Sequence, residues 1–224
     1  MAALLRLPLL LALVVSPLLG AAAGPNAKRG LVFIESPDPA VNNVWLQPGS
    51  PLTWYYNYMQ NASGPFASAP TGTPQLEFVP MWWGATNKTD VSFLANMTAL
   101  IKSGKKIVNV LGFNQPDSDW GEGGSNIAPA DAALLWVNNF VPLKAQFGVR
   151  LGLPVVKASR DPGNWTLPFL ANCSALLAGK PCDFDFVPIH AFGNISALTA
   201  RIDSFNKAYV DTSLRNPLPR ALDN

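Results

Sequence analysis

Charged residues are scarce in this sequence. Only 13% of its 224 residues are Asp, Glu, Lys or Arg, and the formal net charge is +2. A nucleic-acid-binding protein needs clustered Lys and Arg to displace counterions, so we expect no nucleic-acid partner. The hydrophobic fraction of 49% is in turn too high for an intrinsically disordered chain. The length allows one domain with a substantial core and lies near the lower limit for an eight-stranded α/β barrel, roughly 200 to 250 residues.

Cysteine and histidine are almost absent. The chain has two cysteines, Cys173 and Cys182, and one histidine, His190. These three side chains cannot complete a four-ligand zinc site, so we expect no metal. The two cysteines are spaced to close a short loop, and we predict that they form a disulfide in an oxidising compartment.

Nucleotide-binding signatures are missing as well. No G-x-G-x-x-G follows the first expected strand and no G-x-x-x-x-G-K-[ST] occurs anywhere, so we expect no nucleotide and no other cofactor. After the N-terminal segment, no apolar run is long enough to cross a bilayer, and we expect no stable membrane insertion. Internal repeats and low-complexity linkers are also absent, which favours a single domain.

Residues 1–23 are expected to be a secretory signal peptide. Arg6 supplies a positive charge, residues 7–19 are almost wholly apolar, and Ala21-Ala22-Ala23 offers a cleavage site. A membrane anchor is the alternative, but the apolar run is short for a span of about 20 residues. Removing the peptide leaves about 201 residues (224 − 23). We therefore expect a secreted, extracellular protein, with attachment to a cell wall as a further hypothesis.

Six N-x-[ST] sequons agree with secretion, and none has proline in its middle position. Their asparagines are Asn61, Asn87, Asn96, Asn164, Asn172 and Asn194. Glycans at these positions would add polar groups to a surface that is poor in charge. We therefore expect a glycoprotein.

Short apolar runs alternate with segments of helical periodicity. The expected strands are 31–34, 52–58, 76–82, 107–113, 149–155 and 184–190, and the expected helices are 91–102, 129–140, 167–177 and 195–209. Continuous apolar strands are typical of a parallel sheet that is buried on both faces. Repeated strand–helix units predict an α/β fold, either a barrel or an open sheet.

In parallel α/β folds, functional residues lie at the carboxyl ends of the strands. These ends are rich in aromatic and amide side chains, and they hold Glu35, Trp54, Tyr56, Asn57, Tyr58, Trp82, Trp83, Asn114, Gln115, Asp117 and His190. Aromatic rings stack on the CH faces of sugars and amides bind hydroxyl groups, so this set predicts a carbohydrate-binding surface. Core packing is the open alternative for Trp54, Tyr56 and Tyr58. Because Trp82 and Trp83 are adjacent and point opposite ways, we expect at least one of them to face the site.

The segment L-G-F-N-Q-P-D at 111–117 resembles the G-F-N-E-P-D signature that ends the fourth barrel strand in fungal glycoside hydrolase family 128. Further blocks match in order: K-R-G-L at 28–31, W-Y-Y-N at 54–57, F-V-P-M-W at 78–82, S-N-I at 125–127 and C-D-F-D-F-V-P-I-H at 182–190. The resemblance implies a (β/α)8 TIM-barrel type, here truncated to about six strands, with β-1,3-glucan or a related cell-wall polysaccharide as its partner. The domain would span 28–209, followed by an atypical tail at 210–224.

The same resemblance implies impaired catalysis. Retaining glycosidases need two carboxyl groups about 5 to 5.5 Å apart. Gln115 stands where the family has its acid/base Glu, and an amide has no proton to give to the glycosidic oxygen. No segment matches the W-x-[TS]-E-F-like strand that carries the nucleophile. The residues expected to remain for sugar binding are Trp54, Tyr56, Asn57, Trp82, Trp83, Asn114, Gln115 and His190.

Other carboxylates are weaker candidates for chemistry. Glu35 ends the first expected strand and is the best of them, whereas Asp117 is expected to cap the following turn. Glu122 lies in a glycine-rich loop and is expected to be solvated, and Asp183 and Asp185 lie at the wrong end of the sixth expected strand.

Three hypotheses stay open at this point. The chain is a secreted β-glucan hydrolase homologue without catalysis, a glucan-binding wall protein, or an incomplete gene product. The third follows from six strands, which leave a parallel barrel open with two exposed edges. The sequence does not determine the oligomeric state.

Overall fold

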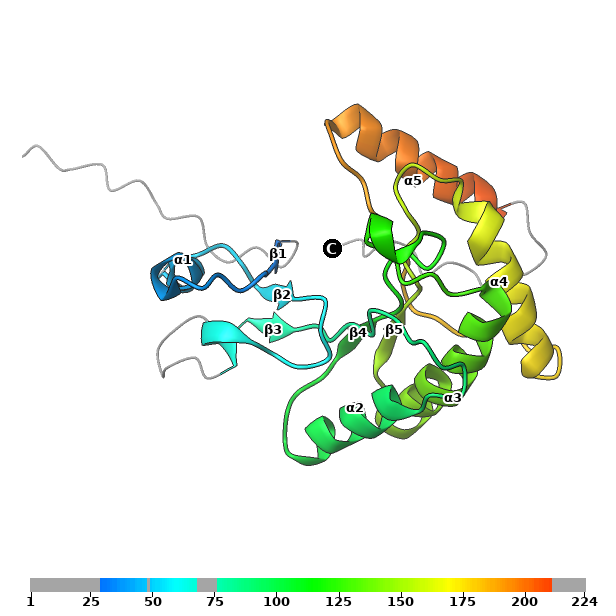
Figure 1. Cartoon of the computed structure of the whole chain (residues 1–224), viewed down its shortest axis with the longest axis horizontal. Helices are drawn as coiled ribbons and strands as arrows, with labels where there is room; N and C mark the ends of the chain where they lie inside the picture. The colour runs from blue at the N-terminus through cyan, green and yellow to red at the C-terminus, as the bar shows by residue number, and fades with distance from the viewer. Residues whose placement is uncertain (1–28, 48, 68–75, 211–224) are drawn as a thin grey trace, which may run out of the picture.

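The computed structural model describes residues 29–47, 49–67 and 76–210 (Figure 1). In chain order its elements are β1 (Gly30–Val32), α1 (Pro39–Asn43), η1 (Val44–Leu46), β2 (Trp54–Tyr56), η2 (Gly64–Phe66), β3 (Glu77–Phe78), α2 (Ser92–Lys102), β4 (Asn109–Leu111), η3 (Trp120–Glu122), α3 (Pro129–Phe147), β5 (Arg150–Gly152), α4 (Pro162–Leu176) and α5 (Ile195–Val210). The expected signal peptide lies outside the described residues, as do Lys28 and the expected tail from Asp211 onward.

All strand pairs in the described chain are parallel. β1, β2 and β3 form one ladder and β4 and β5 form a second. A bridge between Met81 and Leu111 connects the two ladders, and a bridge between Gly152 and Phe186 continues the order beyond β5. The prediction of an α/β fold with parallel strands is therefore confirmed.

The expected sixth strand is wrong as a regular strand. The described residues contain five strands, and segment 184–190 contributes only the bridge at Phe186. Two causes are local. Pro188 has no N–H to donate to a ladder, and the N–H groups of Asp185 and Phe186 both donate to the carbonyl oxygen of Leu151, at 2.8 and 3.2 Å. Segment 184–190 has the apolar pattern of a strand, but these two features interrupt its pairing with β5.

The hydrophobic core lies between β4 and β5 and the helices α2, α3 and α4. Figure 1 shows these helices and α5 gathered on the β4–β5 side, while β1 to β3 extend away from them. Phe140 of α3 is fully buried at the centre, with ring centroids 4.2 Å from Trp136 and 4.8 Å from Phe93. None of the helices within the described ranges combines the length and the apolar composition needed to span a membrane.

Two helices are longer than the sequence predicted, and each contains a proline. α3 continues past Pro142 to Phe147 and ends at Gly148, whose φ of 67° is left-handed. α4 begins at Pro162, after the Asp161 side chain accepts a hydrogen bond from the Gly163 N–H, and it continues through an internal proline. Proline normally interrupts a helix because it lacks an N–H. The expected helix 129–140 ended before Pro142, whereas the expected helix 167–177 already contained Pro168 and began five residues too late. Tertiary packing of α3 against α4 overrides that preference.

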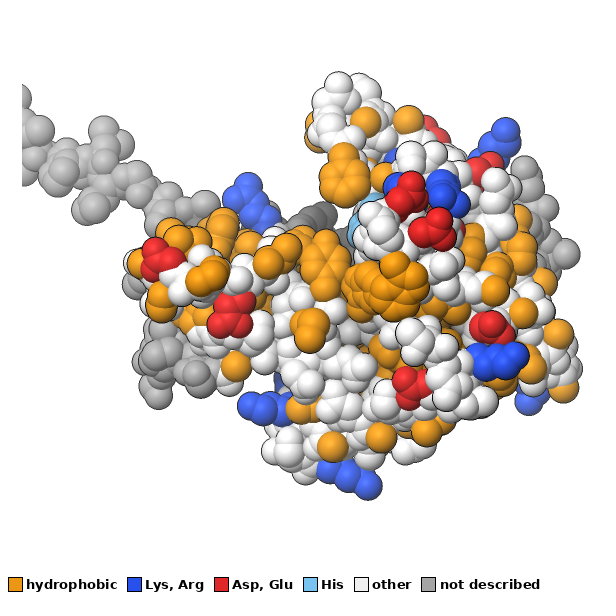
Figure 2. Space-filling model, viewed as in Figure 1, with side chains coloured by type: hydrophobic (Ala, Val, Ile, Leu, Met, Phe, Trp, Pro, Cys, Tyr) orange, Lys and Arg blue, Asp and Glu red, His pale blue; other side chains and the backbone are white. Residues whose placement is uncertain are grey.

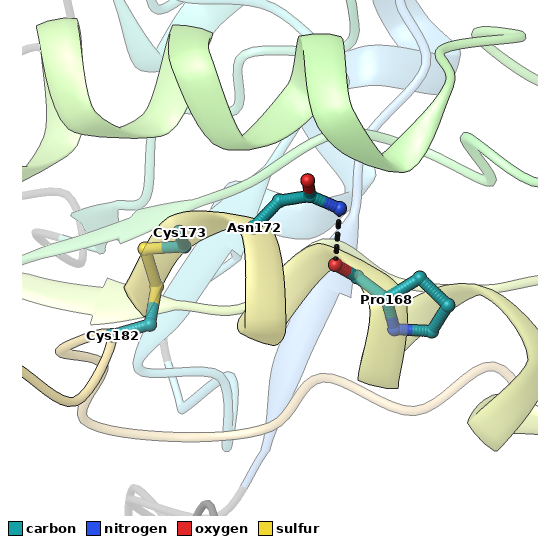
Figure 3. Close-up of a disulfide and its surroundings, with 4 residues drawn as sticks. All are labelled: Pro168, Asn172, Cys173 and Cys182. Atoms are coloured by element: carbon teal, nitrogen blue, oxygen red, sulfur yellow. Dashed lines mark hydrogen bonds between the residues drawn. A yellow bond between two sulfur atoms is a disulfide. The ribbon is translucent and has the colours of Figure 1, made fainter. Parts of the chain in front are cut away.

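The predicted disulfide between Cys173 and Cys182 is confirmed (Figure 3). Both residues are buried, and their Cα atoms are 5.5 Å apart. The bond ties the end of α4 to the chain that leads into segment 184–190. The neighbouring Asn172 side chain donates a hydrogen bond of 2.7 Å to the carbonyl oxygen of Pro168, one turn earlier in α4.

Candidate functional site

A groove of about 520 Å³ runs along the inner face of the parallel strands, on the side opposite to the core helices. Its walls include Trp54, Tyr56, Phe186 and His190. The inner face follows from strand periodicity, because alternate residues of one strand point to the same side. Gly152 leaves room for the Phe186 ring in the groove wall, because a Cβ at position 152 would lie 2.5 Å from that ring.

The aromatic wall of the groove comes from β2. Trp54 and Tyr56 are half-buried and line the groove, whereas Tyr55 between them is 1% exposed and packs on the outer side. Core packing was the open alternative for Trp54 and Tyr56, and both residues lie in the groove instead. The Tyr58 ring lies outside the groove lining, 5.0 Å from that of Tyr56, with the two hydroxyl oxygens 3.4 Å apart. Burial, and then the hydrogen bond with Tyr58, raise the pKa of Tyr56.

The floor of the groove is polar, and the sequence analysis missed it. Glu77, Asn109 and Arg150 line the groove at the start of their strands. The Asn109 amide donates a 2.7 Å hydrogen bond to Glu77, and the Arg150 guanidinium lies 5.9 Å from the centre of the Phe186 ring. The prediction considered only the carboxyl ends of the strands, whereas these three residues lie at the amino ends. Their shared parity with inward-facing residues farther along each strand was the signal that could have found them.

Gln115 and His190 meet at the upper end of the groove. The Gln115 Nε2 donates a hydrogen bond of 2.9 Å to His190 Nδ1, so the proton of the neutral imidazole is on Nε2. The two residues are 75 positions apart in sequence. The structure thus brings together the single histidine and Gln115, which the sequence motif predicted to stand at the acid/base position.

The backbone of Gln115 is held in an unusual conformation. Its φ is 43°, in the left-handed region that residues other than glycine rarely adopt. Its N–H donates to the carbonyl oxygen of Val155 at 2.7 Å, and its own carbonyl oxygen accepts from the N–H groups of Ser118 and Ser125. These bonds compensate the strain and fix the direction in which the amide side chain leaves the backbone.

Burial and a nearby positive charge favour the neutral form of His190. Burial is the largest cause of its lowered pKa, and the positive charge of Arg201 lowers it further, while Asp117 acts in the opposite direction. Arg201 is 9% exposed and donates to the carbonyl oxygens of Lys157 and Arg160, so its position is well defined. A neutral imidazole is suited to hydrogen bonding with a sugar hydroxyl.

The two asparagines of the predicted site stabilise loops. Asn57 is 7% exposed, and its amide donates to the carbonyl oxygen of Asn61 and to the Ser63 hydroxyl. Asn114 is 5% exposed and donates to the carbonyl oxygen of Gly123. The Oδ1 atom of Asn114 is buried without a hydrogen-bond partner among the described residues. Both side chains lie beneath the surface rather than in the lining of the groove.

The two adjacent tryptophans separate as expected. Trp82 is 2% exposed and stacks on Phe93 in the core, with centroids 5.2 Å apart, so the structure does not bring it to the groove. Trp83 is half-buried and contacts Trp120, with centroids 5.0 Å apart. Trp83 is therefore the more accessible of the two, and neither tryptophan is part of the groove lining.

The remaining carboxylates have structural partners or lie elsewhere. Glu35 is exposed and lines a separate pocket beside α1, away from the groove. Asp117 accepts a hydrogen bond of 2.9 Å from the Lys157 N–H, so it anchors a distant loop rather than the turn that follows it. Lys144 forms ion pairs of 2.9 Å with both Asp183 and Asp185, which fits their position at the opposite end of the segment.

Glu122 was expected to be solvated, and this expectation was incomplete. Its Oε2 accepts a hydrogen bond of 2.7 Å from the Ser118 hydroxyl and forms an ion pair of 2.8 Å with Lys157. These two hydrogen bonds, the Lys157 one first, lower the pKa of Glu122 to about 2. In the part of the chain that the structure describes, no group of three or more His, Cys, Asp or Glu residues could hold a metal ion.

Solved structures with a similar fold belong to one glycoside hydrolase family. An endo-β-1,3-glucanase of glycoside hydrolase family 128, subgroup II, from Pseudomonas viridiflava is 25% identical, with a TM-score of 0.56, and the match covers 70% of this chain and 58% of that one. A subgroup I endo-β-1,3-glucanase from Amycolatopsis mediterranei, in complex with laminaritriose, is 26% identical with a TM-score of 0.52, over 81% of this chain and 66% of that one.

A third structure is described as a binding protein. It is a subgroup VII oligosaccharide-binding protein of family 128 from Cryptococcus neoformans, 26% identical with a TM-score of 0.54, over 75% of this chain and 59% of that one. The chain spans less than two thirds of each of these three structures. A comparison with curated proteins found no match.

The family comparison agrees with the resemblance that the sequence motifs indicated. The model of the glycosyl hydrolase catalytic core matches residues 30–214, which include every strand and helix of the described fold. The similar structures above are members of family 128. The chain therefore belongs to the glycosyl hydrolase catalytic core family.

Proposed function

We propose that this chain binds β-1,3-glucan oligosaccharides in its groove and does not hydrolyse them. The observation that carries the proposal is the contact between Gln115 and His190. It supports the proposal because a non-titrating amide, which stands where the resembling family motif has its acid/base Glu, is directed at the imidazole. The aromatic wall of Trp54 and Tyr56 supplies faces on which pyranose rings can stack. The laminaritriose complex of the similar Amycolatopsis enzyme supports the choice of ligand.

The absence of hydrolysis follows from the chemistry of the amide. A retaining glycosidase protonates the leaving oxygen with one carboxyl group and attacks the anomeric carbon with a second. The Gln115 side chain can donate a hydrogen bond to a glycosidic oxygen but cannot transfer a proton to it. Glu77 lies in the floor of the groove, where it accepts a hydrogen bond from Asn109. It is at the start of its strand, at the opposite end of the groove from Gln115, and so it is not placed to act as the second carboxyl group.

We propose further that residues 28–209 form a barrel-type domain with an open side. The parallel order β1 to β5, continued by the bridge at Phe186, supports a part of a (β/α)8 arrangement. The open side would leave the groove accessible along its length, which suits a polymer better than a small molecule.

Secretion and glycosylation belong to the same proposal. The apolar leader at 1–23, the disulfide and the exposure of five of the six sequon asparagines support an extracellular protein that meets its polysaccharide at a cell wall. An incomplete gene product is the rival explanation, and an open frame downstream of codon 209 that encodes W-x-T-E-F-like residues would favour it.

Calorimetric titration tests the binding proposal. We expect laminarihexaose to bind to the full chain, and we expect Tyr56→Ala to weaken binding by about 3- to 10-fold because a stacking face is lost. Glu35→Ala is the matched control, because Glu35 is exposed and lies outside the groove, and it should leave the affinity unchanged. Release of shorter sugars that stops in Glu35→Ala would contradict the proposal.

A further inference from the structure

Trp120 is the most exposed of the seven tryptophans, and it is not part of the hydrophobic core. It is 52% exposed, on the short helix η3 that follows β4. Its indole ring contacts that of the half-buried Trp83 at a centroid distance of 5.0 Å and an interplanar angle of 47°. We refer to Trp83 and Trp120 as the aromatic pair. It is not part of the groove lining.

The loop that carries Trp120 is braced on both sides. Glu122 accepts a hydrogen bond from Ser118 within the loop and forms ion pairs with Lys157 at 2.8 Å and Arg160 at 3.5 Å across from it. Gly123 takes a left-handed φ of 82°, which closes η3, and its carbonyl oxygen accepts from the Asn114 amide. The exposed ring is therefore held in place before any ligand arrives, which reduces the entropy lost on binding.

The aromatic pair lies next to the upper end of the groove. The Asn114 N–H donates to the carbonyl oxygen of Trp83 at 2.9 Å, and Asn114 directly precedes Gln115, which contacts His190 in the groove wall. The Gln115 carbonyl oxygen in turn accepts from Ser118 at the base of the loop. Figure 2 shows hydrophobic side chains gathered in the middle of the face that is viewed, beside a group of acidic and basic side chains.

We propose that the aromatic pair is an outer binding site for a pyranose ring of a β-glucan chain that extends beyond the groove. This inference rests on the proposed function. The CH face of a pyranose stacks on an indole ring, and Asp119, which is exposed and directly precedes Trp120, can accept a hydrogen bond from a sugar hydroxyl. A protein partner is the competing occupant of an exposed tryptophan. The braced loop and its polar surroundings favour the sugar.

The test is calorimetric titration of the full chain with laminarihexaose. We expect Trp120→Ala to weaken binding by about 3- to 10-fold. Trp120→Gln, which keeps a long side chain without a ring, should do the same, and Trp120→Phe should retain most of the affinity. Trp45→Ala is the matched control, because Trp45 is 42% exposed on η1, in another part of the fold, and should not change binding. Near-ultraviolet circular dichroism checks that each variant is folded.

The possible results separate this inference from the proposed function. If the unchanged chain binds laminarihexaose and Trp120→Ala and Trp120→Gln bind it equally well, the outer site is wrong and the groove proposal stands. If the unchanged chain does not bind laminarihexaose, both proposals fail. If light scattering shows that Trp120→Ala changes the oligomeric state while glucan affinity stays the same, the aromatic pair is a protein interface and the inference is overturned.

Discussion

Gln115 has two properties that bear on the chemistry of the proposed site. Its amide cannot transfer a proton, and its hydrogen bond to His190 fixes the imidazole as an acceptor at Nδ1. A carboxyl group at position 115 would reverse this relation, because a carboxylate accepts hydrogen bonds and favours a protonated imidazole beside it. Gln115 therefore favours an uncharged His190 at the end of the groove.

Gln115→Glu is expected to raise the pKa of His190 above its value in the unchanged chain. The new carboxylate would lie within hydrogen-bonding distance of Nδ1 and stabilise the imidazolium. Proton NMR measures the effect without assignment, because the chain contains a single histidine. Equal pKa values in the two proteins would contradict the contact between the two side chains.

The stability of the protein should depend on pH through His190. Burial and Arg201 lower the pKa of His190 in the folded state, whereas the unfolded chain has the ordinary value of about 6.5. The unfolded state therefore binds the proton more readily, and the contribution of His190 to the free energy of unfolding, complete above pH 6.5, decreases as the pH falls below it.

Urea unfolding at pH 7.5 and pH 5.5 measures this dependence. The unchanged chain should lose more stability between the two values than His190→Asn, which cannot be protonated. If the two proteins lose the same amount, His190 has an ordinary pKa and is not held neutral by its surroundings.

At this scale the sequence predicted the identity of the key residues better than their surroundings. The G-F-N-Q-P-D motif singled out Gln115, and His190 was predicted as a separate sugar-binding residue, without a contact between the two. Their contact spans 75 positions and depends on the bridge at Phe186, which no local pattern encodes. Trp120 was not predicted as a binding residue, because a lone tryptophan in a glycine-rich loop has no periodicity that indicates whether it is exposed.

At the scale of elements, strand parity was predictable and element boundaries were not. The alternation along β2 placed Trp54 and Tyr56 on one face, as the structure has them. The predicted helix boundaries were wrong at the end of α3, which continues through Pro142, and at the start of α4, which lies five residues before the expected one. At the internal prolines, packing of α3 against α4 outweighs the loss of a backbone hydrogen bond. The sixth strand failed because the position of Pro188 interrupts a pattern that is otherwise apolar and strand-like.

The disulfide is expected to stabilise the junction between α4 and segment 184–190. Replacing both Cys173 and Cys182 by Ala should lower the free energy of unfolding by about 2 to 3 kcal/mol, since the bond closes a loop with a sequence separation of 9 residues. Denaturant unfolding with and without reductant measures this. The unchanged chain should lose stability in reductant, and the double variant should not respond to it. No loss in either protein would show that the bond is dispensable.

At the scale of the whole molecule, the helices cover one side of the parallel strands and leave the groove on the other. The core between β4, β5 and the helices is well packed, whereas the inner face carries half-buried aromatic and polar side chains. The sequence predicted the α/β class with parallel strands and the family, because both depend on ordered motifs along the chain. It did not recover the groove, because the floor residues come from strand starts that are adjacent only after folding.

Glycosylation provides a prediction for the secreted molecule. Five sequon asparagines are exposed, whereas Asn96 is half-buried and its amide donates to Gln60 at 3.1 Å. When the full chain is secreted from eukaryotic cells, we expect glycans at Asn61, Asn87, Asn164, Asn172 and Asn194, and lower occupancy at Asn96. Glycopeptide mass spectrometry measures each site, and Asn96 serves as the internal control. Highest occupancy at Asn96 would contradict the described surface.

Native mass spectrometry of the chain with laminarihexaose tests the central claim most directly, because one spectrum reports both binding and cleavage. We predict a complex with the mass of the protein plus one intact hexasaccharide, and this species should persist over hours without shorter sugars appearing. A spectrum that contains only free protein would contradict binding. Laminaribiose or laminaritriose accumulating with time would contradict the loss of catalysis at Gln115.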